Sequence, residues 1–288
     1  MDKKLCIFHN KDHDGHCSAK TVKRKFRDVE LVGLDYGDQF PWEKIKDHDV
    51  IMVDFSISPP DMRRLAREAR HLTWIDHHRT AIKWSTEENF TGGADNVVAF
   101  LNTSFAACEL TWFHFFPGQQ MPRFIHHVGR YDIWDHTDPE TVSFHHGLLG
   151  YLTNPELDAE AAEKTWNTLF SDNAFTDQLI KEGEVVKRAT RVANIVYARR
   201  NCFETTLAGL PVVAINREGG SELFEGVFDS TKHKMMVVFG WRNGLWDFSL
   251  RSEGELDVSA IAAQFGGGGL KNAAGFQIKG HLPDGFLR

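Results

Sequence analysis

Short runs of apolar residues alternate with polar, helix-forming stretches along the first part of the chain. The runs have the length of buried strands, and they lie at residues 5–9, 30–34, 49–56 and 71–76. A helical stretch begins near Gly15, and Pro59 and Pro60 open another. Strands that alternate with helices predict a parallel sheet with helices on its faces, so the expected fold class is α/β.

The pattern changes twice further along the chain. From Thr103 to about Tyr131 apolar residues recur at near-helical spacing, and Pro117-Gly118 ends that run. The aromatic residues in it are best explained as core packing. A long stretch of mixed charge from about Phe175 to Arg200 predicts a connecting helix.

From Cys202 onward the sequence predicts a second, smaller α/β domain. Strand-like runs recur, and Asn243-Gly244 between two of them is a hairpin signal. A helix is expected at 257–265, then a glycine run, then a last strand at 274–280. We therefore expect a first domain at 1–180, a connecting helix at 181–201 and a second domain at 202–288.

Composition narrows the classes of protein. A chain of 288 residues favours two domains. It has 33 basic and 40 acidic residues, for a net charge of -7. A negative net charge is unfavourable for binding long nucleic acid. The four cysteines form no C-x-x-C pair, which argues against structural zinc and against disulfides. No apolar stretch is long enough for a signal peptide or a membrane span, so a cytoplasmic protein is expected.

Acidic residues and histidines follow the predicted strands where those strands end. Each group alone is explained equally well by a helix cap or a turn. However, the carboxyl ends of parallel strands are where ligands bind in such sheets, so three successive ends favour one common site. The residues concerned are His9, Asp12, Asp14, Asp54, Asp76, His77 and His78.

Asp132 is a weaker fourth candidate. It lies in GRYDIW, between predicted helical segments, and could fold back over the sheet. The whole set contains carboxylates and imidazoles but no thiolate, which favours Mn²⁺ or Mg²⁺ over structural zinc. Two such ions, typically ~3.5–4 Å apart, activate water for attack on a phosphate ester.

Four motifs in order, HNKDHDG, VDFS, DHH and RYD, resemble the signature motifs of the DHH phosphoesterase family. The later SLRS and GGGGLKNAAGF resemble the DHH-associated substrate-binding domain found in many members. The resemblance covers nearly the whole chain. The ordered set is specific, whereas each motif alone is not.

The resemblance implies roles for individual residues of the first domain. His9 and Asp12 match the ligands of one metal ion, and Asp54 matches the carboxylate that bridges both ions. The ligands of the other ion would be Asp14, His77 and Asp132. Asp76 resembles a residue that orients a ligand, and His78 resembles the histidine that faces the substrate phosphate.

In the second domain, Arg251 and Ser252 match the phosphate-contacting motif. Gly267, Gly268 and Gly269 match a loop whose backbone amides approach the substrate. One residue departs from the family pattern, because Leu270 stands where a histidine usually follows the glycines. Lys271 is a candidate to replace that histidine.

The expected activity is that of a phosphodiesterase with two Mn²⁺ ions, or Mg²⁺, which hydrolyses short oligonucleotides or linear dinucleotides to mononucleotides. Two alternatives are a pyrophosphatase or exopolyphosphatase, and a nucleotide-binding regulatory module without catalysis. A homodimer is left open. Other histidine pairs, at 126–127 and 145–146, lack obvious carboxylate partners and are interpreted as surface or core residues. Trp241 and Trp246 are interpreted as packing residues.

Overall fold

The computed structural model describes residues 3–87, 94–283 and 285–286. The chain forms two compact units, Met1–Lys187 and Arg188–Arg288. The division falls within one long helix, α8 (Asn173–Asn201), which corresponds to the helix expected from about Phe175 to Arg200. The domain boundaries predicted above remain a proposal.

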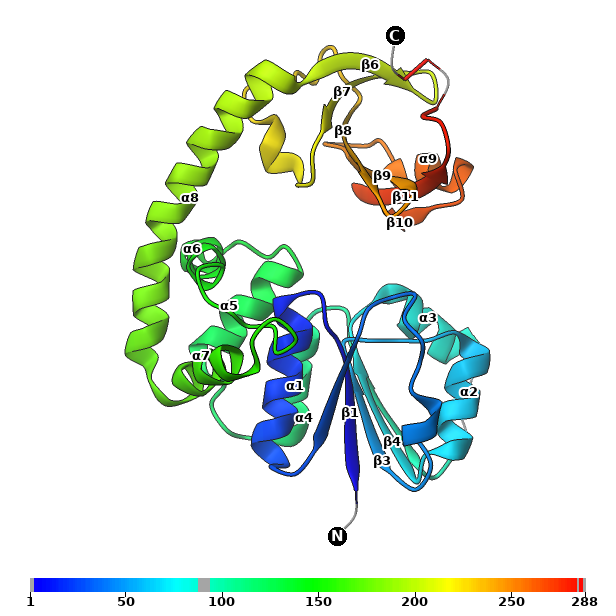
Figure 1. Ribbon diagram of the computed structural model, residues 1–288, viewed down its shortest axis with the longest axis vertical. Coiled ribbons are helices and arrows are strands. Elements are labelled where there is room, and N and C mark those ends of the chain that lie inside the picture. Colours follow the sequence, from blue (N-terminus) through cyan, green and yellow to red (C-terminus); the bar gives the residue numbers. More distant parts are fainter. Residues whose placement is uncertain (1–2, 88–93, 284, 287–288) are drawn as a thin grey trace. The chain divides into compact units, whose positions relative to one another are not determined.

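The first unit is built on a parallel sheet (Figure 1). Among the described residues, five strands follow the order β2-β1-β3-β4-β5 and all neighbouring pairs are parallel. The strands are β1 (Lys4–His9), β2 (Glu30–Leu34), β3 (Asp49–Val53), β4 (His71–Asp76) and β5 (Val97–Leu101). The predicted α/β fold with a parallel sheet is confirmed.

Helices cover both faces of this sheet (Figure 1). On one face, Met52 and Trp74 pack with residues of α2 and α3. On the other face, Ile51 and Ile75 pack with residues of α1 and α4. Successive strand residues point to opposite faces, which is why each strand is apolar along its length. The helices are α1 (His13–Lys25), α2 (Pro59–Glu68), α3 (Arg79–Glu87) and α4 (Ala107–Phe115).

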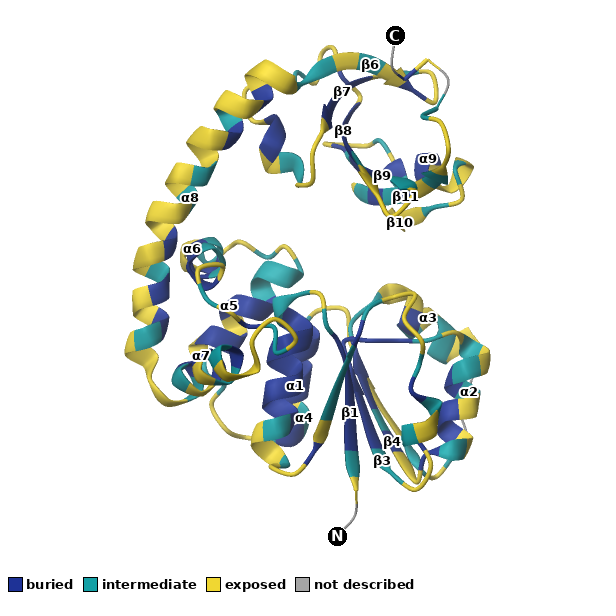
Figure 2. Cartoon of the chain, viewed as in Figure 1, coloured by how far each residue is buried: buried dark blue, intermediate teal, exposed yellow. Residues whose placement is uncertain are grey.

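A second core of this unit is made by helices alone. Phe124, Phe144 and Trp166, on three successive helices, pack into it and are fully or almost fully buried. Figure 2 shows that α1 is buried over much of its surface, as expected for a helix placed between the sheet and this layer. The remaining elements are α5 (Arg123–Asp132), α6 (Pro139–Leu148), α7 (Ala159–Ser171) and the short 3₁₀ helix η1 (Trp42–Lys44).

The second unit contains a mixed sheet with the order β10-β11-β9-β8-β7-β6 in its described part. Only β7 and β8 pair in parallel. Asn243 and Gly244 both have positive φ, as a two-residue hairpin turn requires, so the predicted hairpin is confirmed. The elements are β6 (Phe203–Leu207), β7 (Leu210–Asn216), η2 (Ser221–Phe224), β8 (Met235–Arg242), β9 (Leu245–Arg251), α9 (Val258–Gln264), β10 (Gly268–Leu270) and β11 (Ala273–Lys279).

Several elements were not predicted from the sequence. The strand β5 was not predicted although VVAFL is an apolar run of strand length; it lies at the edge of the sheet, where Val98 and Phe100 are exposed. The helical stretch expected over 103–131 is two helices, α4 and α5, separated by a loop around Pro117-Gly118. The helices α3, α6 and α7 were also missed.

Candidate metal centre

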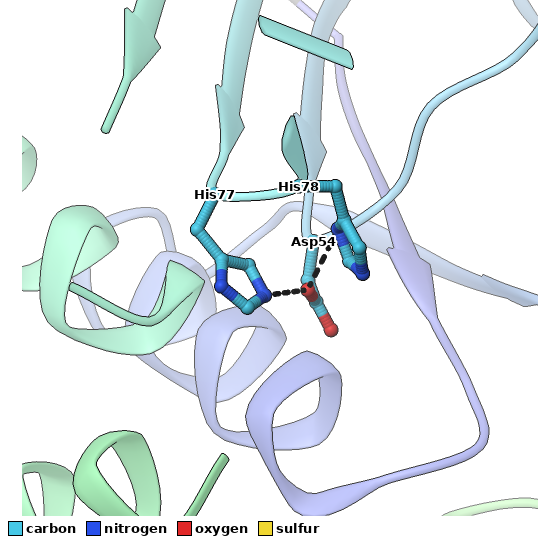
Figure 3. A group of neighbouring side chains, drawn as sticks. All are labelled: Asp54, His77 and His78. Atoms are coloured by element: carbon cyan, nitrogen blue, oxygen red, sulfur yellow. Dashed lines mark ion pairs between the residues drawn. The ribbon is translucent and has the colours of Figure 1, made fainter. Parts of the chain in front are cut away.

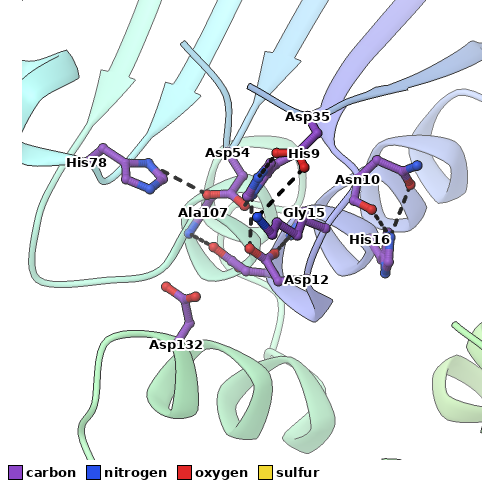
Figure 4. A network of polar contacts seen from close by, with 12 residues as sticks. His9, Asn10, Asp12, Gly15, His16, Asp35, Asp54, His78, Ala107 and Asp132 are labelled. Carbon is purple, nitrogen blue, oxygen red and sulfur yellow. Dashed lines mark hydrogen bonds and ion pairs between the residues drawn. The ribbon is translucent and has the colours of Figure 1, made fainter. Parts of the chain in front are cut away.

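Three neighbouring strands end at the same edge of the sheet and carry the predicted residues there (Figure 4). His9 is the last residue of β1, Asp54 follows β3 directly, and Asp76 is the last residue of β4. The loop after β4 continues with His77 and His78. Because β1, β3 and β4 are adjacent and parallel, side chains far apart in the sequence meet at one edge.

Asp54 is the residue that the other side chains surround. One of its carboxylate oxygens, Oδ2, lies 3.6 Å from His9 Nδ1, and the other, Oδ1, lies 3.3 Å from His77 Nε2. Figure 3 shows Asp54 between His77 and His78, and His78 Nδ1 is 3.9 Å away. Asp54 has φ of 53°, a left-handed conformation that is unfavourable for a residue with a side chain. This strained conformation places the Asp54 carboxylate at the centre of the cluster.

On one side of Asp54 lie His9 and Asp12. His9 Nδ1 is 2.9 Å from Asp12 Oδ2, while Asp12 Oδ1 caps α1 by accepting a hydrogen bond of 3.0 Å from the Gly15 amide. A Cβ on Gly15 would lie 1.9 Å from the His9 carbonyl oxygen. Only glycine therefore allows α1 to begin so close to the end of β1, which brings Asp12 to His9.

On the other side lie Asp14, His77 and Asp132. His77 Nε2 is 3.7 Å from Asp14 Oδ2 and 3.4 Å from Asp132 Oδ2. Asp14 is held by the amides of Ala107 and Cys108 at 2.8 and 2.7 Å, which belong to the first turn of α4. The positive end of that helix stabilises a buried carboxylate.

Asp132 reaches the cluster from a helix rather than from the sheet (Figure 4). It is the last residue of α5, whereas the sequence placed it between helices. The end of α5 is held by Arg130, whose guanidinium pairs with Glu109 of α4 and lies 3.4 Å from Asp135. Sequence reasoning missed this Arg130–Glu109 pair, because the two residues meet only after α4 and α5 pack.

His78 and Asp76 form a separate contact at the rim of the cluster. Asp76 is fully buried, and its Oδ1 accepts hydrogen bonds from the His77 and His78 amides and, at 2.7 Å, from His78 Nδ1. Asp76 therefore orients the loop that carries both histidines. The His78 ring is held through one nitrogen, and its side chain is 41% exposed.

The electrostatics of the cluster are those of crowded carboxylates. Burial and the neighbouring Asp14 raise the pKa of Asp54 and of Asp132 well above the usual range. Burial alone lowers the pKa of His9, but Asp12 and Asp54 outweigh it and raise the pKa to about 10. For Asp12, burial opposes ionisation, yet His9 brings its pKa down to about 2. Excess negative charge in a buried place favours binding of cations.

The donor set fits divalent metal ions. Three groups of side chains each bring their ligand atoms within 4.8 Å of one another, and two of them share Asp54. His9 Nε2 and Asp54 Oδ1 are buried without a hydrogen-bond partner, whereas His9 Nδ1 lies 2.9 Å from Asp12 Oδ2. Donor atoms buried without partners are costly unless a cation satisfies them. The groups are His9-Asp12-Asp54, Asp54-His77-His78 and Asp14-His77-Asp132.

The candidates of the second unit have partners within that unit. Arg251 ends β9 and donates through Nη1 to Ser249 Oγ and the Leu250 carbonyl, both at 2.9 Å. Burial lowers the pKa of Arg251. Ser252 is buried and donates to the Leu256 carbonyl at 2.8 Å, and Lys271 pairs with Glu255 at 2.8 Å.

The glycine run does not form an open loop along its whole length. Gly268 and Gly269 belong to β10, which pairs with β11. A Cβ on Gly267 would lie 2.1 Å from the Gly275 carbonyl oxygen, so a close backbone approach requires glycine there. Leu270 ends β10, and its side chain lies outside the described part of the structure.

Two histidines that the sequence analysis set aside have polar or aromatic neighbours. His127 is buried, and its Nδ1 lies 3.8 Å from Asp138, so the expectation that it lacks a carboxylate neighbour was wrong. His145 stacks on Tyr131 with ring centroids 3.5 Å apart. No local pattern indicates either contact, because the partners meet only where α5 packs against α6.

No protein-family model matches the chain. A curated relative, uncharacterized protein R106 of Acanthamoeba polyphaga mimivirus, is 28% identical over 276 residues, covering 89% of this chain. The chain spans 59% of the length of that relative.

Solved structures resemble the chain more in shape than in sequence. The pGpG-specific phosphodiesterase PggH of Vibrio cholerae matches with a TM-score of 0.51 at 13% identity, covering 96% of this chain and 94% of that chain. RecJ of Thermus thermophilus in complex with Mn²⁺ matches with a TM-score of 0.48 at 15% identity, covering 96% of this chain and 50% of that chain. The likeness to PggH shows a shared fold, which agrees with the α/β architecture predicted from the sequence.

Within residues 3–87, 94–283 and 285–286, no helix has the length and apolar character needed to cross a membrane.

Proposed function

We propose that this chain is a phosphoesterase of the DHH family that hydrolyses phosphodiesters in short nucleotides with two divalent metal ions. The observation that supports it best is the cluster of three ligand groups at one edge of the sheet, in which Asp54 lies close to His9 on one side and to His77 on the other. The ordered motifs and the DHH-type fold agree with it.

The proposed ligands divide around Asp54. His9 and Asp12 would hold one ion, and Asp14, His77 and Asp132 would hold the other, with Asp54 between them. Two bound ions would supply an activated water and stabilise charge on the phosphoryl oxygens. The set contains only oxygen and imidazole donors, which suits Mn²⁺ or Mg²⁺.

The remaining residues would position the substrate. Asp76 accepts from His78 Nδ1, which leaves Nε2 of that ring for a phosphate oxygen. Burial lowers the pKa of His78, but the hydrogen bond to Asp76 and the charge of that carboxylate outweigh burial, so the pKa is raised above its usual value. A raised pKa suits a ring that contacts a phosphate oxygen. In the second unit Arg251, Ser252, Lys271 and the amides of the glycine run are proposed substrate contacts.

Short nucleotides are the proposed substrate class because the net charge of -7 disfavours a long polyanion. The test is to incubate the protein with Mn²⁺ or Mg²⁺ and a panel of linear dinucleotides, short oligonucleotides, long single strands and pyrophosphate, and to separate the products. Mononucleotide release from the short substrates, abolished by a chelator, is expected. Release of phosphate from pyrophosphate alone, or rapid digestion of long strands without dinucleotide hydrolysis, would contradict the proposal.

A further inference from the structure

A cavity of about 460 Å³ lies beside the candidate metal centre, entirely within the first unit. Asp12, Asp14 and Asp132 form one part of its wall. Asp12 is a proposed ligand of one ion, and Asp14 and Asp132 are proposed ligands of the other. A molecule with a phosphate at the metal centre could therefore extend directly into this cavity. The volume is within the range of sites for small organic ligands.

The wall away from the carboxylates is aromatic and apolar. Tyr131 and His145 stack with ring centroids 3.5 Å apart and an angle of 5° between their planes. Trp134 lies nearly parallel to Tyr131, at 24° and with 6.4 Å between centroids. Leu148 and Leu149 also line the cavity. Flat, parallel rings form a surface on which another flat ring can stack.

Trp134 is the least expected residue of this wall. It has φ of 59° and is 63% exposed, so a large aromatic side chain is held in a left-handed conformation without being buried. Its ring lies 5.3 Å from that of His136, but its backbone conformation would suit glycine or asparagine better than tryptophan. Strain of this kind concentrates at ligand sites.

The charge of the cavity selects against a second phosphate group. The pKa of His145 is lowered to about 3, first by burial and then by the neighbouring His13, so this ring adds no positive charge to the wall. Lys11, at the edge, lies 3.8 Å from Asp35. Next to three carboxylates, such a wall suits an uncharged aromatic group.

We propose that this cavity binds the base of the nucleotide whose phosphate lies at the metal centre, with Trp134 and Tyr131 as the stacking surface. The proposal rests on the function proposed above and adds a site for one nucleoside within the first unit. Stacking is tolerant of the identity of the base, so the site would accept purines and pyrimidines.

The test uses the full chain with Mn²⁺, the dinucleotide pApA and two analogues of it, each lacking one of the two bases. Three variants are compared: Trp134→Gly, which suits the left-handed backbone; Trp134→Phe, which keeps a ring; and Phe113→Ala. Phe113 is an exposed aromatic residue on α4 that does not line the cavity, so it controls for loss of an exposed ring. Melting temperatures are recorded for all of them.

Trp134→Gly is expected to raise KM for pApA roughly 10-fold with little change in kcat, since stacking of one base contributes about 1–3 kcal/mol. Its melting temperature should not fall. For the analogue that lacks the stacked base, wild type and variant should have the same KM. Trp134→Phe should recover most of the affinity, and Phe113→Ala should behave as wild type. An unchanged KM for pApA in Trp134→Gly, or equal increases with both analogues, would overturn the proposal.

Binding of AMP in the presence of Mn²⁺, followed by calorimetry, separates this inference from the proposed function. If the wild type binds AMP and Trp134→Gly binds it roughly 10-fold more weakly, while no substrate is hydrolysed, then the base site stands and the catalytic proposal fails. If hydrolysis proceeds but AMP binding is the same in both proteins, the base site fails and the catalytic proposal stands.

Discussion

The candidate residues of the first unit and those of the second differ in how their polar atoms are satisfied. In the first unit, His9 Nε2 and Asp54 Oδ1 are buried without a hydrogen-bond partner. In the second unit, Arg251, Ser252 and Lys271 each bond to a neighbour in their own unit. Buried unpartnered donors indicate a ligand that belongs there, whereas satisfied side chains must exchange partners to bind one.

The two sets of candidate residues therefore differ in what ligand binding would change within each unit. Folding brings the carboxylates together and raises the pKa of Asp54 and of Asp132 by burial and mutual repulsion. Binding of cations should therefore stabilise the first unit. Ligand binding should stabilise the second unit little, because one hydrogen bond is only exchanged for another. Changes in the first unit should therefore have the larger effects.

The strongest test of this difference is Asp54→Asn. Asparagine tolerates the left-handed backbone at this position but lacks the charge, so the fold should persist while both proposed ions lose a ligand. We expect turnover to fall by roughly 10³-fold or more. The rate is measured with a dinucleotide at saturating Mn²⁺, and circular dichroism checks the fold.

Asp35→Asn is the matched control for this variant. Asp35 lies 3.6 Å from His9 Nε2 but belongs to none of the three ligand groups. Its loss should lower activity much less than the loss of Asp54. Equal effects of the two substitutions would mean that general negative charge, rather than ligation by Asp54, matters.

Proton release is the next largest expected effect. The pKa of His9 is raised to about 10 in the metal-free protein, so at pH 7.5 the ring is protonated and must lose its proton to bind a metal. Metal affinity should therefore rise with pH up to about 10. Calorimetry in buffers of different ionisation enthalpy counts the protons released, and His9→Asn should remove about one of them. A release that does not depend on His9 would remove this residue from the ligand set.

The same shift predicts the pH dependence of stability without metal. Because the folded pKa of His9 lies above its unfolded value, the His9 contribution is fully present below about pH 6.5 and is lost as pH rises through about 10. Thermal unfolding of the metal-free protein between pH 6 and 10 should therefore show a smaller loss of stability in His9→Asn than in the wild type.

Arg251→Ala tests the second unit and should have a smaller effect. We expect KM for a dinucleotide to rise roughly 10-fold with little change in kcat, because a hydrogen bond to a charged group is lost. Ser249→Ala is the control, since it removes only the bond within the unit. If Ser249→Ala raises KM as much as Arg251→Ala does, Arg251 acts by supporting its own unit.

Lys271 should show the smallest effect. It is exposed and pairs with Glu255, and an exposed pair of this kind contributes ~0–1 kcal/mol to stability. Lys271→Ala should raise KM by no more than about threefold, whereas Glu255→Ala should lower it slightly by releasing the lysine. Steady-state kinetics of both variants test this. If Lys271 contacts substrate, KM must rise in Lys271→Ala and fall in Glu255→Ala.

The sequence predicted the sheet of the first unit better than the helices around it. Runs such as 49–56 and 71–76 are apolar because they are buried on both faces, and this signal is local. The edge strand β5 carries an apolar run as well, VVAFL, and was not predicted, although its Val98 and Phe100 are exposed rather than buried. The helices α6 and α7 carry mixed patterns that only their packing in the second core explains.

The residues at the strand ends could be predicted from the sequence alone. An apolar run that stops at His9, Asp54 or Asp76 predicts both a strand and the position of its end. Parallel pairing then requires those ends to share an edge. Three contacts could be seen only in the tertiary structure. Asp132 reaches the cluster from α5, and backbone amides of α4 bind Asp14. Trp134 and His145 line a cavity beside the cluster. Those contacts join elements whose packing no local pattern encodes, since a residue's neighbours along the chain do not specify its neighbours in space.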